Sequence, residues 1–338
     1  MSRVDAAEVD DPGRARDDAA AGFDVRRFDL RGRALTAEEA GPLAAAIAAG
    51  ELVEADLLAP EEAAALAEEL AALHHAHLPP GEDAYSQLLA GAGGAAFNWG
   101  TAAGEGAVPL DLAARPLLAR VAASALALAA ALRAPGEEVL LSLVPSLRRT
   151  RTFPRFFHRD SHRSVDEVAA ESAAGGRPSD YRAVWDLGLE HSSDVLDVAF
   201  APRAALLAPG GGIAPGFRRL FQLQDLDFRR LSDAAIDAVQ PQMREETLPF
   251  GGSQRRLLPG RVFVWHDDHW FHSTYLRRGR RIEELVLRPR SILVVRSFAA
   301  NAHRAIPWSE AARRALAGVL GAAPARGVYG PATVRGDR

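Results

Sequence analysis

The stretch FPRFFHRDSHR, residues 153–163, places an imidazole and a carboxylate two positions apart, at His158 and Asp160. Residues i and i+2 of a β-strand lie on the same face, so in an extended segment both side chains can bind one cation. Histidine and carboxylate are both donors that divalent transition metals accept. Two ligands leave such a site incomplete, and a third has to come from another part of the chain. A solvated polar loop after a strand is the competing interpretation of the same residues.

A second segment, PGRVFVWHDDHWFHST at residues 259–274, offers three candidates for the third ligand: His266, His269 and His272. Two histidines and one carboxylate form the donor set of non-heme Fe(II) oxygenases, and this set leaves coordination positions open. Zinc and manganese bind the same donors, so spacing alone does not select the metal. We expect the histidines of this segment that are not ligands to have structural or supporting roles.

In their order and context these two segments resemble the 2-oxoglutarate/Fe(II)-dependent dioxygenases, and within them the phytanoyl-CoA dioxygenase-like branch. That family has His-x-Asp and then a distant histidine, which often follows another histidine by six positions and precedes a small or hydroxyl residue. His266, His272 and Ser273 have this layout. The resemblance implies that His158, Asp160 and His272 are the catalytic Fe(II) ligands, and that Ser273 lies at the cofactor site.

The resemblance covers about residues 139–299, and it also implies 2-oxoglutarate as a co-substrate whose distal carboxylate pairs with an arginine. A guanidinium suits this role because it offers two parallel N–H donors to a carboxylate. Arg290 stands before the apolar run SILVV, as the family's arginine stands before its last strand, and Arg288 would share its face. Arg280 and Arg281 stay as rivals, because the segment that precedes Arg290 is longer than is usual in this branch.

The implied activity is the hydroxylation of a small molecule, derived from a natural product or an amino acid, with dioxygen as oxidant. 2-Oxoglutarate would become succinate and carbon dioxide; desaturation and cyclisation share this chemistry. Six arginines near the first motif form either a solvated face or a mouth that attracts an anionic substrate: Arg148, Arg149, Arg151, Arg155, Arg159 and Arg163. Two alternatives stay open, a cupin-like metal enzyme without 2-oxoglutarate and a non-catalytic jelly-roll binding protein.

Short segments rich in Val, Leu, Ile, Phe and Trp position these candidates, and Pro and Gly divide them, which predicts strands. We expect strands at residues 138–149, 151–160, 181–189, 194–202, 261–268 and 284–298, and a helix at about 225–243. Strands that do not alternate with helices favour a mainly β fold with flanking α, a double-stranded β-helix (jelly roll, cupin-like) with helices packed outside.

The first third of the chain predicts helices. Thr36 and Glu39 fit a capping box, Pro60 fits the first turn of a second helix, and a nearly all-apolar helix follows Asp111. The segment AFNWG at residues 96–100 and the loop at about residues 165–180 are candidate lids. We expect four regions. Residues 1–22 form a disordered tail, and residues 23–135 form a mainly helical N-terminal region that packs on the barrel and is a candidate homodimer face. Residues 136–300 form the catalytic core, and residues 301–338 form a C-terminal helix and tail.

Composition excludes several other classes of protein and site. The 338 residues are 48% hydrophobic and 25% charged, which is typical of globular proteins. There is no cysteine, so disulfides, thiolate metal sites and cysteine nucleophiles are excluded. A net charge of -4 gives no general case for binding nucleic acid or a membrane surface. No apolar run has the length of a membrane span or the character of a signal peptide, so a cytoplasmic location is expected.

Overall fold

The computed structural model describes the chain in separate stretches. The described residues are 25–78, 85–91, 93–101, 104–133, 139–148, 181–189, 196–203, 253–276, 290–299 and 319. Five predicted segments lie outside them: the tail at 1–22, the strand at 151–160, the candidate lid at about 165–180, the helix at 225–243 and the start of the C-terminal helix near residue 309.

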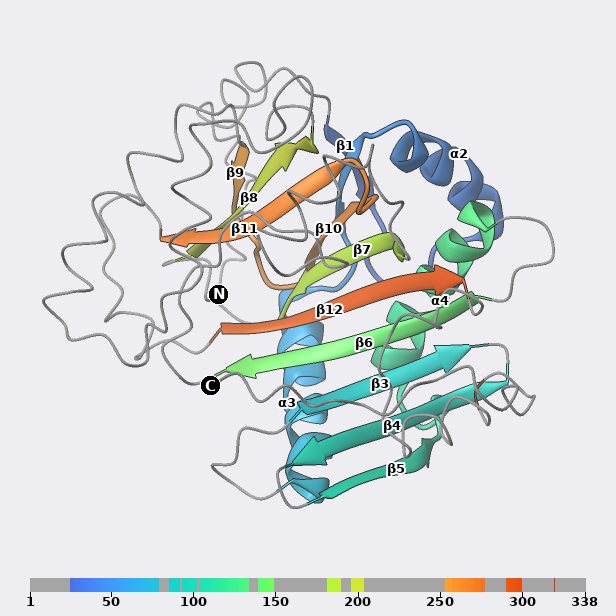
Figure 1. Ribbon diagram of the computed structural model, residues 1–338, viewed down its shortest axis with the longest axis vertical. Coiled ribbons are helices and arrows are strands. Elements are labelled where there is room, and N and C mark those ends of the chain that lie inside the picture. Colours follow the sequence, from blue (N-terminus) through green and yellow to red (C-terminus); the bar gives the residue numbers. More distant parts are fainter. Residues whose placement is uncertain are drawn as a thin grey trace, which may run out of the picture.

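Nine of the described strands form one large mixed sheet with the order β1-β2-β10-β7-β12-β6-β3-β4-β5 (Figure 1). Their bounds are β1 (Val25–Asp29), β2 (Leu52–Asp56), β3 (Tyr85–Gly91), β4 (Gly94–Thr101), β5 (Gly104–Leu110), β6 (Val139–Arg148), β7 (Tyr181–Gly188), β10 (Arg261–Trp265) and β12 (Arg290–Ala299). Strands β1 and β2 are parallel, and every other neighbouring pair is antiparallel. The sheet thus joins strands from both ends of the sequence.

A second, smaller sheet has the order β11-β8-β9, and its strands are β8 (Leu196–Pro202), β9 (Ser253–Arg255) and β11 (Trp270–Leu276). Along the chain, β7 belongs to the large sheet, β8 and β9 to the small one, β10 to the large one, β11 to the small one and β12 to the large one. This alternation between two sheets is the connectivity of a double-stranded β-helix. The predicted fold class, mainly β with flanking helices, is confirmed.

An apolar cluster fills the space between the two sheets. Its buried members come from both sheets, except Leu257, which lies between β9 and β10; they are Leu52, Val184, Val198, Phe200, Leu257, Phe263, Trp265, Trp270 and Ile292. Because side chains alternate along a strand, each member that lies in a strand identifies the positions of that strand that face the interior. We call this cluster the barrel interior.

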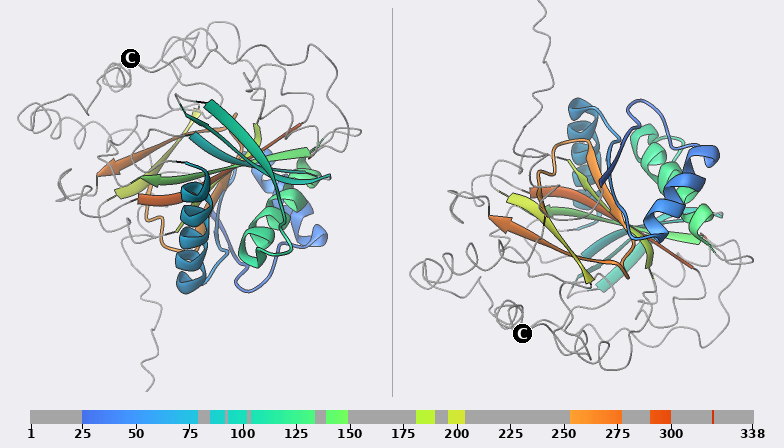
Figure 2. Two further views of the ribbon diagram at one scale, coloured as in Figure 1. Left: turned by 90° about the horizontal axis from the view of Figure 1, so that it is seen from below. Right: turned by 90° about the horizontal axis from the view of Figure 1, so that it is seen from above.

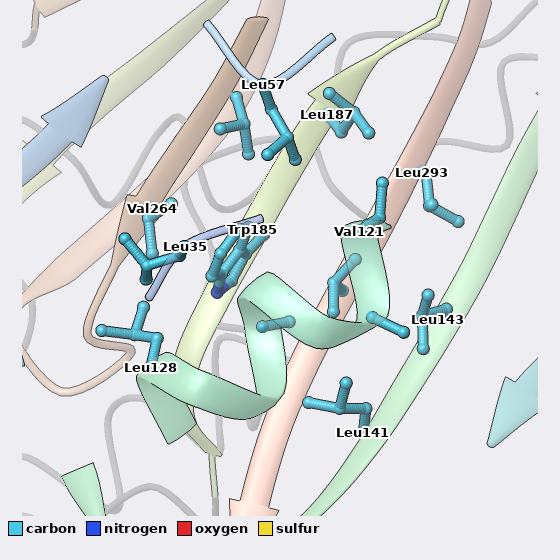
Figure 3. Close-up of a cluster of buried hydrophobic side chains, with 14 of the residues drawn as sticks. Leu35, Leu57, Val121, Leu128, Leu141, Leu143, Trp185, Leu187, Val264 and Leu293 are labelled. Atoms are coloured by element: carbon cyan, nitrogen blue, oxygen red, sulfur yellow. The ribbon is translucent and has the colours of Figure 1, made fainter. Parts of the chain in front are cut away.

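Within the described ranges, three helices cover the opposite face of the large sheet: α2 (Ala37–Ala48), α3 (Pro60–His77) and α4 (Pro116–Leu132) (Figure 2). In Figure 3, Val121 and Leu128 of α4 lie against side chains of the sheet that include Leu143 and Trp185. Burying one such leucine contributes about 1.5–3 kcal/mol, so this layer is a major source of stability. None of the helices in the described stretches is both long and apolar enough to cross a bilayer.

Helices α2 and α3 begin at the residues that the sequence predicts. The Thr36 hydroxyl accepts a hydrogen bond from the backbone N–H of Glu39 at 3.3 Å, and the Glu39 carboxylate accepts one from the backbone N–H of Thr36 at 3.0 Å. This is the predicted capping box, which is therefore confirmed. Pro60 is the first residue of α3, as expected, whereas α4 begins at Pro116, several residues after Asp111.

The region expected to be mainly helical also contributes five strands, β1 to β5, to the large sheet. Strands β3, β4 and β5 extend the sheet beyond β6. The segment AFNWG lies within β4 and pairs with β3 on one side and with β5 on the other. The prediction that this segment is a lid is therefore wrong, because its backbone is held in the sheet.

Candidate functional site

His272 lies on the inner face of the small sheet. It is the third residue of β11 and shares a face with Trp270, which belongs to the barrel interior. Only 7% of the residue is exposed. The centroid of its imidazole ring lies 4.7 Å from the centroid of the Trp265 ring on β10, a strand of the large sheet. The imidazole therefore lies between the two sheets, in mainly apolar surroundings.

Aromatic side chains enclose this position. Phe200 of β8 is the cross-strand partner of His272. Its ring centroid lies 5.1 Å from that of Trp265 and 5.3 Å from that of Phe263. All three aromatic residues are buried. Such surroundings exclude water and strengthen electrostatic contacts, because the local dielectric constant is low.

The turn before β11 attaches the small sheet to the end of α2. The Nε2 atom of His269 lies 3.0 Å from the carbonyl oxygen of Ala48, and Trp270 Nε1 donates a hydrogen bond to the carbonyl oxygen of Gly50 at 2.9 Å. His269 is exposed at this helix end, whereas His272 is buried between the sheets. The contact of His269 therefore helps to hold the turn before β11 against the end of α2.

His266 shapes the same turn. Its Nδ1 accepts a hydrogen bond from the backbone N–H of Asp268 at 3.1 Å, and its ring centroid lies 5.2 Å from that of His269. Burial lowers the pKa of the His266 imidazole, and this effect outweighs the nearby Asp268 carboxylate, which raises it. A neutral ring fits this contact, since Nδ1 can accept the hydrogen bond only when it carries no proton.

The structure places two of the residues predicted for the cofactor site. Arg290 is the first residue of β12, and Ile292 of the same strand belongs to the barrel interior, so position 290 is in the inner-face register. Ser273 follows His272 on β11, and alternation puts position 273 on the opposite face of that strand. The roles of Arg290 and Ser273 stay predictions.

His158, Asp160 and Arg288 lie outside the described residues, and so do the rivals Arg280 and Arg281. Within the described stretches, no three His, Asp or Glu side chains are grouped closely enough to hold a metal ion. The metal site with three protein ligands therefore stays a prediction.

Two charged residues that the sequence did not single out are buried inside the barrel. Arg255 of β9 is only 2% exposed, and its cross-strand partner is Val198 of the barrel interior. Asp186 of β7 is also buried, and its partners on either side are Phe263 and Val294. No signal in the sequence marks these two residues as buried, because their burial depends on the register of strands that are far apart in the chain.

A further ionic contact joins β2 to β10. Arg261 Nη1 lies 2.9 Å from Glu54 Oε1, and Arg261 Nε donates a hydrogen bond to Asp56 Oδ1 at 3.0 Å. Glu54 is buried, and Arg27 of β1 contributes a second cation, whose Nε lies 3.7 Å from Glu54 Oε2. These charges connect three neighbouring strands of the large sheet.

Comparisons with known proteins give likeness in structure alone. No protein-family model and no curated protein sequence matches the chain. A prolyl-4-hydroxylase from Pseudomonas putida is 12% identical, with a TM-score of 0.36, over 77% of this chain and 97% of that one. The epimerase SnoN from nogalamycin biosynthesis, described as non-heme and alpha-ketoglutarate-dependent, is 16% identical, with a TM-score of 0.37, over 78% and 85%.

EctD from S. alaskensis, solved with 2-oxoglutarate and 5-hydroxyectoine, is 13% identical, with a TM-score of 0.40, over 82% of this chain and 83% of that one. TM-scores this low carry no argument about activity.

Proposed function

We propose that this protein is a non-heme, Fe(II)- and 2-oxoglutarate-dependent oxygenase that hydroxylates a small molecule. The observation that carries the proposal is His272, a buried histidine on the inner face of the small sheet of a double-stranded β-helix. The His158 and Asp160 motif supports it from the sequence, because this motif lies in the segment that connects β6 with β7.

The residues fit the group that the proposal requires. Two histidines and one aspartate suit Fe(II) and leave coordination positions for further ligands. Bound iron would supply the activation of dioxygen. His158, Asp160 and His272 would hold the metal, and the ring contact with Trp265 would fix the orientation of the His272 imidazole.

The chain's other residues would bind the co-substrate and keep water out. Arg290, in the inner-face register at the start of β12, would pair with the distal carboxylate of 2-oxoglutarate. Phe200, Phe263 and Trp265 would exclude water from the reacting groups, which limits side reactions. The arginine-rich sequence around His158 favours an anionic substrate, derived from a natural product or an amino acid.

Metal binding by His272→Ala tests the proposal. We expect the purified wild-type protein to bind iron(II) with a ratio of about one ion per chain, and the variant to bind it at least about 100-fold more weakly, because an open site loses one of its three protein ligands. The metal content after anaerobic dialysis and the calorimetric affinity for iron(II) would measure this loss.

His269→Ala is the matched control, since it removes a histidine three positions away that contacts the end of α2. We expect this variant to keep the wild-type affinity for iron(II). If both variants bound iron as the wild-type protein does, the proposed metal site would be refuted. If only the control lost the metal, His269 and not His272 would be the ligand.

A further inference from the structure

The indole N–H groups of the buried tryptophans differ in what they contact. A buried indole N–H usually has a hydrogen-bond acceptor, because leaving the donor without one is unfavourable. Trp270 follows this rule, since its Nε1 donates to the carbonyl oxygen of Gly50 at 2.9 Å. In this chain a structural tryptophan of the barrel interior thus has its donor satisfied by the backbone.

Trp265 does not follow the rule. It is fully buried, and no atom of the described stretches accepts a hydrogen bond from its Nε1. Its ring lies on the inner face of β10, with its centroid 4.7 Å from that of His272 and 5.1 Å from that of Phe200. The donor therefore belongs to a side chain that is in ring contact with the histidine that we assign to the metal.

We propose that Trp265 is a co-substrate-binding residue, whose indole N–H donates a hydrogen bond to a carboxylate oxygen of 2-oxoglutarate. This inference rests on the function proposed above. The indole is a donor and never an acceptor, so its partner has to present oxygen lone pairs. A carboxylate is a strong acceptor, and the apolar surroundings of Trp265 and Phe200 would strengthen such a bond.

Trp185 provides a matched control within the same chain. It is also buried, and its Nε1 likewise has no acceptor within the described stretches. Its ring, however, packs in the core between the helices and the outer face of the large sheet (Figure 3). A co-substrate bound beside His272 would leave the Trp185 indole unaffected.

Indole N–H signals in a nitrogen-15 NMR spectrum test the proposal. The chain has five tryptophans, so five indole peaks are expected, and Trp265→Phe and Trp185→Phe would assign the two that matter. Zinc(II) would replace iron(II) as a diamagnetic metal, and 2-oxoglutarate would be the titrant. We expect the signal of the Trp265 indole proton to shift downfield and this proton to exchange more slowly with solvent. The signal of the Trp185 indole proton should keep its position.

Affinity gives a second, independent readout. Trp265→Phe keeps an aromatic ring and removes the donor, so we expect it to weaken 2-oxoglutarate binding to the zinc-loaded protein by roughly tenfold or more, the usual effect of losing a hydrogen bond to a charged group. Trp185→Phe should bind 2-oxoglutarate as the wild-type protein does. Calorimetry on the three proteins would measure these affinities.

The outcomes separate this inference from the function on which it rests. If the wild-type protein did not bind 2-oxoglutarate with metal present, both would be refuted. If it did bind 2-oxoglutarate, either of two results would refute the role of Trp265 alone. One is a Trp265 indole signal that keeps its position and exchange rate, and the other is a Trp265→Phe variant that keeps full affinity for 2-oxoglutarate. Equal shifts at Trp265 and Trp185 would also contradict it, since they would report a general change of the fold.

Discussion

At the scale of single residues, the three histidines of residues 266–272 lie in different environments although they are close in sequence. His272 is buried between the sheets, His269 is exposed at the end of α2, and His266 accepts a hydrogen bond within the turn. The strand alternation that begins at Trp270 accounts for the difference, because it carries His272 to the inner face.

The lowered pKa of His266 predicts a pH dependence of stability. Its pKa in the folded protein lies below the ordinary value of 6.5, chiefly because of burial. As the pH falls through 6.5, the unfolded chain takes up this proton first, so stability is full above 6.5 and is lost between 6.5 and the folded pKa. His266→Asn keeps an acceptor and does not titrate. As the pH falls from 7 to 5, we expect the free energy of unfolding of this variant to decrease less than that of the wild-type protein. Urea unfolding at pH 7, 6 and 5 would measure both.

His266→Ala is the control for this measurement. It removes the titration and also the acceptor for the Asp268 N–H, so it should be less stable at every pH but have the same weak pH dependence as the asparagine variant. If the free energy of unfolding of the wild-type protein changed with pH no more than that of His266→Asn, the lowered pKa of His266 would be contradicted.

Single residues were predictable from the sequence where their type and spacing carry the chemistry. The histidine-rich segment at residues 259–274 is visible without a fold, but by itself it offers three candidates, and the resemblance to the dioxygenases selects His272. The structure shows that His272 is buried, and its role as a ligand stays a prediction. Arg255 and Asp186 could not be singled out, because each is a lone charge in a short strand, and only the pairing register reveals its burial. Whether His158 and Asp160 meet His272 stays a prediction.

At the scale of elements, the contact between β2 and β10 depends on Arg261. Its guanidinium lies 2.9 Å from the buried Glu54 and donates a hydrogen bond to Asp56. Arg261→Met would leave the Glu54 carboxylate buried with a weaker partner, and breaking a buried ion pair costs about 3–5 kcal/mol. We expect a loss of about 3 kcal/mol in the free energy of unfolding, at the lower end of that range, because Arg27 still lies near Glu54.

The double variant Glu54→Gln with Arg261→Met separates the ion pair from simple packing. Neutralising Glu54 removes the uncompensated charge, so the double variant should recover more than half of the stability lost in Arg261→Met. Losses that simply add in the double variant would mean that the two side chains are not energetically coupled.

The elements that could be predicted are those with strong local signals. The capping box at Thr36, the proline that opens α3 and the strands rich in Val, Leu, Phe and Trp agree with the sequence. Strands β1 to β5 were not expected. Segments such as GAAFNWGT and GEGAVPL are rich in Gly and Ala, which have low strand propensity, so pairing with β6 and with one another decides their conformation.

At the scale of the whole molecule, the fold class could be predicted because the later two thirds of the sequence lack the regular alternation of strand and helix. The large sheet has further strands at both edges, β2 and β1 after β10 on one side and β3 to β5 after β6 on the other. No local signal predicts this extension, since it depends on contacts between distant segments. The segment that follows α2 also contacts the start of β11, where Gly50 accepts a hydrogen bond from Trp270.

The central claim is that one iron ion binds inside this barrel and chelates 2-oxoglutarate. The most direct measurement is an anaerobic titration of the iron(II)-loaded full chain with 2-oxoglutarate, followed by visible absorption. We predict a weak charge-transfer band that saturates at a ratio of about one 2-oxoglutarate per chain, because an open metal site leaves coordination positions for a bidentate ligand. A protein that binds iron(II) but develops neither this band nor any heat of 2-oxoglutarate binding would contradict the account.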